Sequence, residues 1–208
     1  VLTNTAKVNK FNLFTLPFFF SRDLSVAKSS GFLQCVLHGL EDVMDDVSAA
    51  AADVLVPVAQ FLVHWLSPDE MHALREMLWS NLAKDDDLSA ATSCILHLLW
   101  KLYSTDDEER DVDCNLKDRV PLLFQFFLHP LTSVRTSAIQ CFHQLLTYTA
   151  DIHVHLHKAA CLIFFNLLTE VNEDILQLNQ ETWKSLIDVY TTEDLVYDFD
   201  AARLTVLT

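Results

Sequence analysis

Glycine is almost absent from this sequence, which contains only Gly31 and Gly39 among its 208 residues. The phosphate-binding loop of nucleoside triphosphatases and the dinucleotide-binding fingerprint each need several glycines in a fixed order. No glycine elbow surrounds a serine or cysteine that would serve as a nucleophile, and the histidines are scattered. We therefore expect no catalytic residue, no cofactor and no small-molecule substrate, and we expect that this chain is not an enzyme.

Positive charge is also scarce. The chain has 14 lysine and arginine residues against 29 aspartate and glutamate residues, which gives a formal net charge of −15. Clustered lysine and arginine attract a phosphate backbone, whereas an acidic surface repels it. We therefore expect no direct contact with nucleic acid. The apolar run FNLFTLPFFF near the start is shorter than the ~20 residues that span a bilayer, so no membrane association is expected.

The five cysteines form neither a disulfide framework nor a C-x-x-C pair. They are Cys35, Cys94, Cys114, Cys141 and Cys161. Most of them fall at helical spacing among apolar residues, where a thiol acts as a small apolar side chain. This pattern indicates a reducing, intracellular compartment.

Three alternating histidines, His153, His155 and His157, are the strongest candidates for metal ligands. A strand would place all three on one face, but the surrounding pattern is helical, so only His153 and His157 share a face. Two ligands fall short of the three or four that zinc requires. The acidic turns lack the spacing and the glycine of a calcium-binding EF-hand loop. No metal site is expected.

Apolar residues recur every three or four positions over a long central stretch, which predicts an α-helix with one apolar face. They are Val47, Ala51, Val54, Leu55, Val58, Leu62 and Trp65. Pro57 lies inside this helix and removes a backbone hydrogen bond. Because the stripe keeps its phase across Pro57, the proline predicts a bend rather than a break.

The same unit of an acidic or polar turn followed by a striped helix returns three times. The residues that open the stripes, Val47, Leu88, Val134 and Ile175, are 41, 46 and 41 residues apart. A period of about 40 to 47 residues built from helix pairs is typical of HEAT and armadillo repeats. The sequence therefore predicts an all-α solenoid of about four to five helix pairs, with inner helices beginning near these four residues.

The repeats are assigned to residues 31–66, 67–104, 117–149 and 152–190, within a single solenoid fragment covering 1–208. Residues 105–116 are predicted to form an acidic loop, because this segment contains six acidic residues and only one arginine. Residues 1–30 and 191–208 show no readable periodicity, and no role is assigned to them.

Several local expectations accompany this repeat assignment. Ser67 and Glu70 predict a capping box at the start of the second outer helix. Trp79 and Trp100 lie off the stripes, and we favour packing against a neighbouring repeat over an exposed interaction patch. The last outer helix is expected to present one apolar side, formed by Leu156, Ala160, Ile163, Phe164 and Leu167.

The turns before the inner helices are rich in acidic residues. These are Asp45, Asp46, Asp85, Asp86, Asp87, Glu173 and Asp174. Turns that join outer to inner helices emerge along one edge of such a stack, so these side chains are candidates for a negative protein-binding ridge. The alternative is that each acidic residue is a solvated helix cap.

Four segments, taken in order, carry a family resemblance. They are GLEDVMDDVSAAAADVLVPVA, LWSNLAKDDDLSAATSCILHLL, SVRTSAIQCFHQLL and EDILQLNQETWKSLI. Together they resemble the N-terminal HEAT-repeat domain of the TATA-binding-protein-associated ATPases, over about Gly31 to Val196. Ser48 and Ser89 depart from the pattern by taking the place of the HEAT arginine kept at Arg135.

The resemblance implies a nuclear transcription regulator and a specific partner. In this family the solenoid holds TATA-binding protein, and a C-terminal DNA-translocating ATPase, absent from this chain, strips that protein from promoter DNA. The resemblance carries over no contact residue. A generic HEAT scaffold or transport adaptor with an unrelated protein partner would share every feature described above, so this alternative stays open.

Overall fold

The computed structural model describes residues 31–41, 45–83, 90–104, 116–148 and 150–189. Within these ranges every regular element is an α-helix or a short 3-10 helix, and no strand occurs. The prediction of an all-α fold is confirmed.

The first two helix pairs follow the predicted order of an outer and then an inner helix. In the first pair, α3 (Phe32–Leu40) packs against α4 (Asp45–Leu55), which continues through η2 (Val56–Val58) into α5 (Ala59–Trp65). In the second pair, α6 (Pro68–Leu82) packs against α7 (Ala90–Ser104).

The third and fourth pairs repeat this arrangement with partly 3-10 outer helices. The third outer helix consists of α8 (Leu116–Arg119) and η3 (Val120–Phe126), and it packs against the inner helix α9 (Thr132–Tyr148). The fourth consists of η4 (Ala150–His155) and α10 (Leu156–Thr169), which packs against the inner helix α11 (Glu173–Val189).

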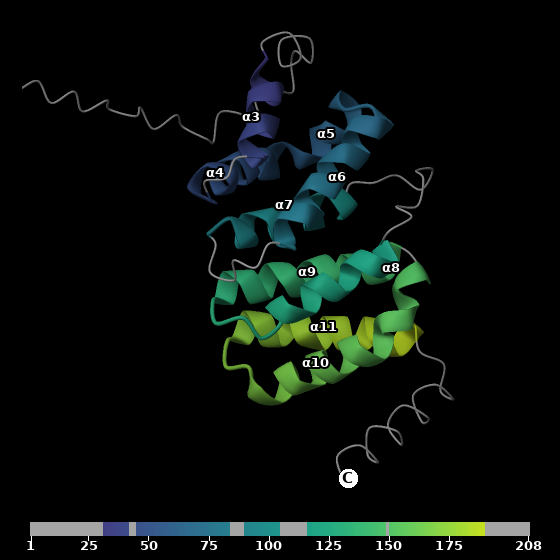
Figure 1. Cartoon of the computed structure of the whole chain (residues 1–208). Coiled ribbons are helices and arrows are strands. Elements are labelled where there is room, and N and C mark those ends of the chain that lie inside the picture. The colour runs from purple at the N-terminus through teal and green to yellow at the C-terminus, as the bar shows by residue number, and fades with distance from the viewer. Residues whose placement is uncertain (1–30, 42–44, 84–89, 105–115, 149, 190–208) are drawn as a thin grey trace, which may run out of the picture.

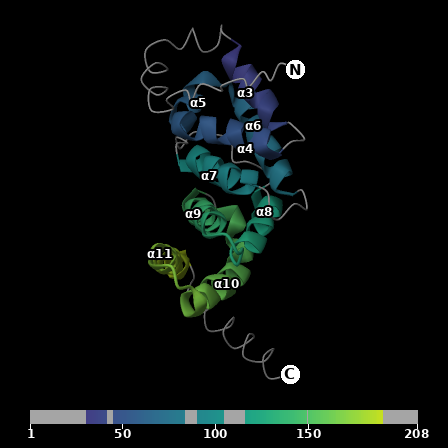
Figure 2. The same ribbon diagram turned by 90° about the vertical axis from the view of Figure 1, so that its left-hand side faces the viewer.

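The inner helices stack on one another in chain order, α4 on α7, α7 on α9 and α9 on α11. Figures 1 and 2 show the pairs arranged in one column from α3 at one end to α10 and α11 at the other. The inner helices all begin at the same side of this column, on the left in Figure 1. We call this side the turn edge, because each outer helix turns there into its inner partner.

At Pro57 the α-helix gives way to a short 3-10 segment, and α5 begins only after Val58, whose backbone is not α-helical. The proline lies in η2, and the buried stripe continues on both sides of it through Leu55, Val58 and Leu62. The start of the stripe was predicted wrongly, because Val47 is 42% exposed. Helix α3 crosses α4 one turn later, where a Cβ on Gly39 would lie only 3.1 Å from the Ala51 Cβ. The Val47 Cγ1 would lie 3.8 Å from the same Cβ on Gly39, so Val47 sits at the border of this crossing and is only partly covered.

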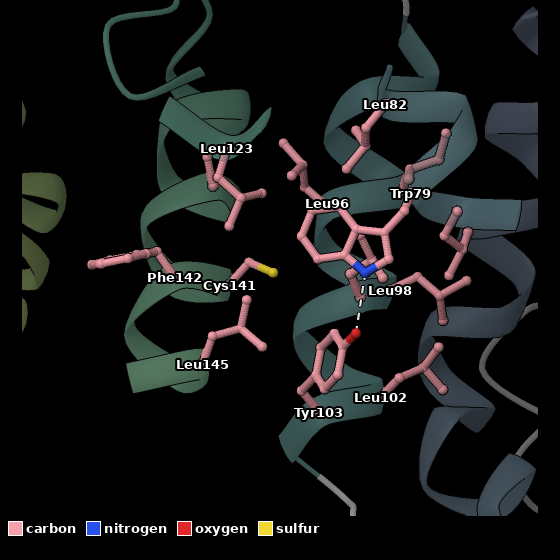
Figure 3. Close-up of a cluster of buried hydrophobic side chains, with 14 of the residues drawn as sticks. Trp79, Leu82, Leu96, Leu98, Leu102, Tyr103, Leu123, Cys141, Phe142 and Leu145 are labelled. Carbon is pink, nitrogen blue, oxygen red and sulfur yellow. Dashed lines mark hydrogen bonds between the residues drawn. The ribbon is translucent and has the colours of Figure 1, made fainter. Parts of the chain in front are cut away.

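Trp79 and Tyr103 link the second pair through the core (Figure 3). Trp79 is fully buried, and its Nε1 donates a hydrogen bond of 3.1 Å to the Tyr103 hydroxyl on α7. The Tyr103 ring in turn meets Tyr148 of α9 edge-on, with centroids 5.2 Å apart. Trp79 is therefore buried rather than part of an exposed patch. Its hydrogen bond goes to α7, the inner helix of its own pair, and not to a neighbouring repeat. Trp100 is half-buried, with the Lys101 ammonium 4.1 Å from its ring centroid.

The apolar face predicted for α10 is partly wrong. The helix buries Leu156 and Ile163 as expected, but it buries Ala159 and Asn166 in place of Phe164, which is exposed. The Asn166 amide lies inside because its Nδ2 donates a hydrogen bond of 3.2 Å to the Phe127 carbonyl of the preceding outer helix. Reasoning from apolar periodicity places polar side chains outside, because burying them normally loses free energy. A buried amide that has a hydrogen-bonding partner avoids most of this loss.

The predicted capping box is confirmed at Ser67 and Glu70. The Ser67 Oγ accepts a hydrogen bond of 3.3 Å from the Glu70 backbone N–H, and a Glu70 carboxylate oxygen accepts from the Ser67 backbone N–H at 2.8 Å. Two orphan donors at the start of α6 are thereby satisfied.

Val134 provides a test of which face of α9 is inside. The residue is 1% exposed, so Val134→Asp would bury an unpaired carboxylate, and we expect the free energy of unfolding to fall by about 3 to 5 kcal/mol. The control Ser133→Asp adds the same side chain one position earlier, where the residue is exposed in the first helical turn, and should change stability by less than about 0.5 kcal/mol. Urea denaturation followed by circular dichroism measures both variants. Equal midpoints would contradict the assigned faces.

Candidate functional site

The described acidic candidates lie at the turn edge. Asp46 is exposed in the first turn of α4, which begins at Asp45, and Glu173 and Asp174 are exposed in the first turn of α11. The three remaining candidates, Asp85, Asp86 and Asp87, lie outside the described residues. The shared edge agrees with the predicted placement, while a protein-binding role for these residues stays a prediction.

Glu173 and Asp174 are not the caps of α11. The residue before them, Asn172, takes that position, since its Oδ1 accepts a hydrogen bond of 3.1 Å from the Ile175 backbone N–H. This leaves both carboxylates of the first turn facing solvent, near the positive end of the helix dipole. Their charge is therefore available to a partner at the turn edge.

Two outer-to-inner turns are fully described, and both are fixed by side-chain hydrogen bonds. In the turn at 127–131, His129 is buried and its Nδ1 accepts a hydrogen bond of 3.1 Å from the Leu131 backbone N–H. In the turn at 170–172, a Glu170 carboxylate oxygen accepts from the backbone N–H groups of Val171 and Asn172, each at 3.0 Å. In each turn, a side chain of the turn itself therefore fixes the backbone.

Arg135 joins these two turns. Its Nη1 donates to the carbonyls of His129 at 2.8 Å and Pro130 at 3.0 Å. Its Nε and Nη2 donate to the two carboxylate oxygens of Glu170 at 2.9 and 3.1 Å. A bidentate arginine–carboxylate pair is the strongest and most directional of the common side-chain ion pairs. We refer to Arg135 and Glu170 together as the turn clamp.

The turn clamp is shielded from water, since 15% of the Arg135 side chain and 5% of the Glu170 side chain are exposed. Burial alone would raise the pKa of Glu170. The hydrogen bonds from the Asn172 backbone N–H, the Arg135 side chain and the Val171 backbone N–H, together with the charge of Arg135, outweigh burial and hold that pKa below its ordinary value. Glu170 is therefore ionised in the folded protein at neutral pH.

Exposed apolar side chains accompany the acidic residues at the turn edge, and the sequence reasoning missed them. Leu128 is 49% exposed, Leu131 is 47% exposed and Val171 is 92% exposed. The signal was their position between two helical stripes, because an apolar residue in a short turn has no helix face to bury it. Leu168, in the last turn of α10, is also exposed.

The three alternating histidines do not converge. His153 is exposed, the His155 Nε2 lies 2.6 Å from the Lys117 carbonyl oxygen, and the His157 Nε2 lies 3.9 Å from the Cys161 Sγ. Across the described ranges no three histidine, cysteine or acidic side chains come together as metal ligands would.

One helical stretch in the described part of the chain, Ile152–Thr169, is long and apolar enough to cross a membrane by length and composition. The same criterion is met by core helices of soluble proteins, so it is weak evidence for a membrane span. Here Ile152 and Ile163 are fully buried against the rest of the stack, and Asn166 donates a hydrogen bond to the third outer helix. Only 28% of this stretch is buried within the stack, and Val154, Phe164, Phe165 and Leu168 are exposed.

The chain matches no protein-family model. It is similar to curated proteins named TATA-binding protein-associated factors. The mot1 factor of Aspergillus fumigatus is 34% identical over 186 residues, covering 82% of this chain, and the BTAF1 factor of Arabidopsis thaliana is 31% identical over 193 residues, covering 72%. The human TATA-binding protein-associated factor 172 is 30% identical over 168 residues, covering 77%.

A column of helix pairs that presents successive turns along one edge is the architecture of helical-repeat proteins, which use extended surfaces for binding. The agreement of these relatives places the chain in a particular group of such proteins. It belongs to the family of TATA-binding protein-associated factors. The chain spans 9 to 10% of the length of these relatives.

The turn clamp provides a test of stability and its pH dependence. Glu170→Gln keeps the shape of the side chain but leaves the guanidinium of Arg135 without its buried counter-charge, so the free energy of unfolding at pH 7 should fall by about 1 to 3 kcal/mol. Because the pKa of Glu170 is lowered by folding, its contribution is present above the ordinary glutamate pKa and is lost as pH falls through the folded value. The difference between wild type and variant should therefore shrink below about pH 4.

Urea denaturation of both proteins at pH 7 and at several values down to pH 3 measures this effect. The matched control is Glu181→Gln, which removes a carboxylate from the exposed side of α11 and should leave stability within about 0.5 kcal/mol of wild type. Equal losses for the two variants at pH 7 would show that the clamp adds nothing beyond a surface charge.

Proposed function

We propose that this chain is part of the repeat scaffold by which a nuclear transcription regulator binds TATA-binding protein. We further propose that the regulator removes TATA-binding protein from promoter DNA with an ATPase that lies outside this segment. The observation that supports the partner most directly is membership in a family whose members are named for their association with TATA-binding protein. The chain itself would contribute binding, not catalysis.

The charge of the turn edge supports the same partner. A protein that binds DNA presents basic side chains to the phosphate backbone. Asp46, Glu173 and Asp174 are exposed at the turn edge, and the repeat pattern assigns Asp45, Asp85, Asp86 and Asp87 to equivalent turns. A row of negative charge would attract a basic partner over a distance set by the ionic strength. In this proposal the acidic residues accelerate encounter, and apolar contacts supply most of the affinity.

Charge reversal at the turn edge tests this proposal. Asp46, Glu173 and Asp174 are changed together to lysine, and association with purified TATA-binding protein is followed at salt concentrations from about 0.01 M to about 0.15 M. We expect association to slow by roughly tenfold at the lowest salt and the difference to shrink as the Debye length falls from about 30 Å to about 8 Å. Circular dichroism confirms the fold of each variant.

The matched control reverses three exposed acidic residues on the opposite edge of the stack, Asp69, Asp118 and Asp188. These positions carry the same change in net charge but lie away from the turns, so their association rate should exceed that of the turn-edge variant at low salt. Equal slowing in both variants would mean that only net charge matters. Failure of the wild-type chain to bind TATA-binding protein would favour a scaffold with an unrelated partner.

A further inference from the structure

The two turns joined by the turn clamp carry exposed apolar side chains on a fixed backbone. Leu131 and Val171 each have their own backbone N–H bonded to a side chain of the same turn, to the His129 ring at 3.1 Å and to the Glu170 carboxylate at 3.0 Å. Both side chains are nevertheless left in solvent. The local structure thus holds the backbone of these residues while leaving their side chains without a place in the core.

The turns are also held close to each other. One guanidinium, that of Arg135, bonds to the carbonyls of His129 and Pro130 and to the carboxylate of Glu170 within 3.1 Å. Leu128 and Leu131 lie on either side of His129 and Pro130 in the chain, and Val171 directly follows Glu170. The three apolar side chains therefore come from neighbouring turns on either side of a single side chain.

Single exposed apolar residues are ordinary on protein surfaces, but a group of them on adjacent ordered turns indicates an interaction site. Binding normally loses free energy when a mobile loop becomes ordered. Here the hydrogen bonds of the clamp and of His129 order the backbone before a partner arrives. This arrangement meets the main requirement of a strong contact region, an apolar anchor that is already in position.

We propose that Leu128, Leu131 and Val171 form an apolar platform, positioned by the turn clamp, on which TATA-binding protein docks through an apolar surface bordered by lysine or arginine. The basic border follows from Glu173 and Asp174, which are exposed two and three residues beyond Val171. This inference rests on the proposed function and deepens it. The acidic residues govern the rate of association, and the platform governs the rate of dissociation.

The test compares dissociation rates from immobilised TATA-binding protein for the whole chain and two double variants. In the platform variant, Leu131→Ser and Val171→Ser are combined. In the control, Val154→Ser and Ile187→Ser are combined, which removes two exposed apolar side chains of similar size from the opposite edge of the stack. We expect dissociation to accelerate about tenfold or more for the platform variant, with association within about twofold of wild type. The control should stay within about twofold in both rates.

A positioning variant separates the clamp from the contact residues. Arg135→Lys keeps the charge but loses the bidentate fork, so it leaves Leu131 and Val171 unchanged while loosening the turns that carry them. Hydrogen exchange of the Leu131 and Val171 amides should accelerate, and dissociation should become faster than wild type without a change in association. Unchanged dissociation alongside faster amide exchange would show that order in the turns does not contribute to binding.

The outcomes distinguish the two proposals. Absence of binding by the wild-type chain overturns both the proposed function and the platform. Binding by wild type with equal dissociation rates for the platform and control variants overturns the platform alone. Sedimentation of the free chain provides a further check, because self-association that the platform variant abolishes would assign this surface to a second copy of the chain.

Discussion

The buried pair of Arg135 and Glu170 is the interaction on which the organisation of the turn edge depends. A guanidinium removed from water is strongly unfavourable unless its donors are satisfied and its charge is balanced. Arg135 meets both conditions by using two backbone carbonyls of one turn and the carboxylate of the next. Glu170 in turn holds two backbone N–H groups. The pair thus fixes two turns that are separated by about one repeat in the sequence.

Directional hydrogen bonds set the register between repeats, while apolar burial supplies most of the stabilisation. The apolar stripes favour stacking but tolerate sliding, because burial is non-directional. Asn81 of α6 donates to the Leu40 carbonyl at 2.9 Å, and Asn166 of α10 donates to the Phe127 carbonyl at 3.2 Å. In both cases an asparagine near the end of one outer helix satisfies a carbonyl at the end of the preceding outer helix. Such bonds are lost when the stack slides, and they therefore specify one arrangement.

The features that the sequence predicts correctly are those with local causes. The stripe through Leu55 and Leu62 and the capping box at Ser67 each depend on residues within a few positions of one another. The errors at Val47 and Phe164 have distant causes. The first depends on where α3 crosses α4, and the second on Asn166, which is buried because it donates to the Phe127 carbonyl 39 residues earlier in the chain. Periodicity counts apolar side chains and cannot anticipate a polar one that finds a remote partner.

The same distinction explains what the sequence revealed of the candidate site. Acidic turns are visible in the sequence because charge is a property of composition, so Asp46, Glu173 and Asp174 were anticipated. The apolar residues beside them were missed. The position of Leu131 and Val171 in short turns between helical stripes was the available signal, but it does not give their degree of exposure, which depends on the packing of the turns. Their exposure changes what the turn edge can do in binding. Charge alone would give a weak, salt-sensitive attraction. Ordered apolar side chains beside the charge can hold a partner once it has arrived. In a chain whose helices bury their apolar faces in stacking, the turns are where a specific contact can form without disturbing the core.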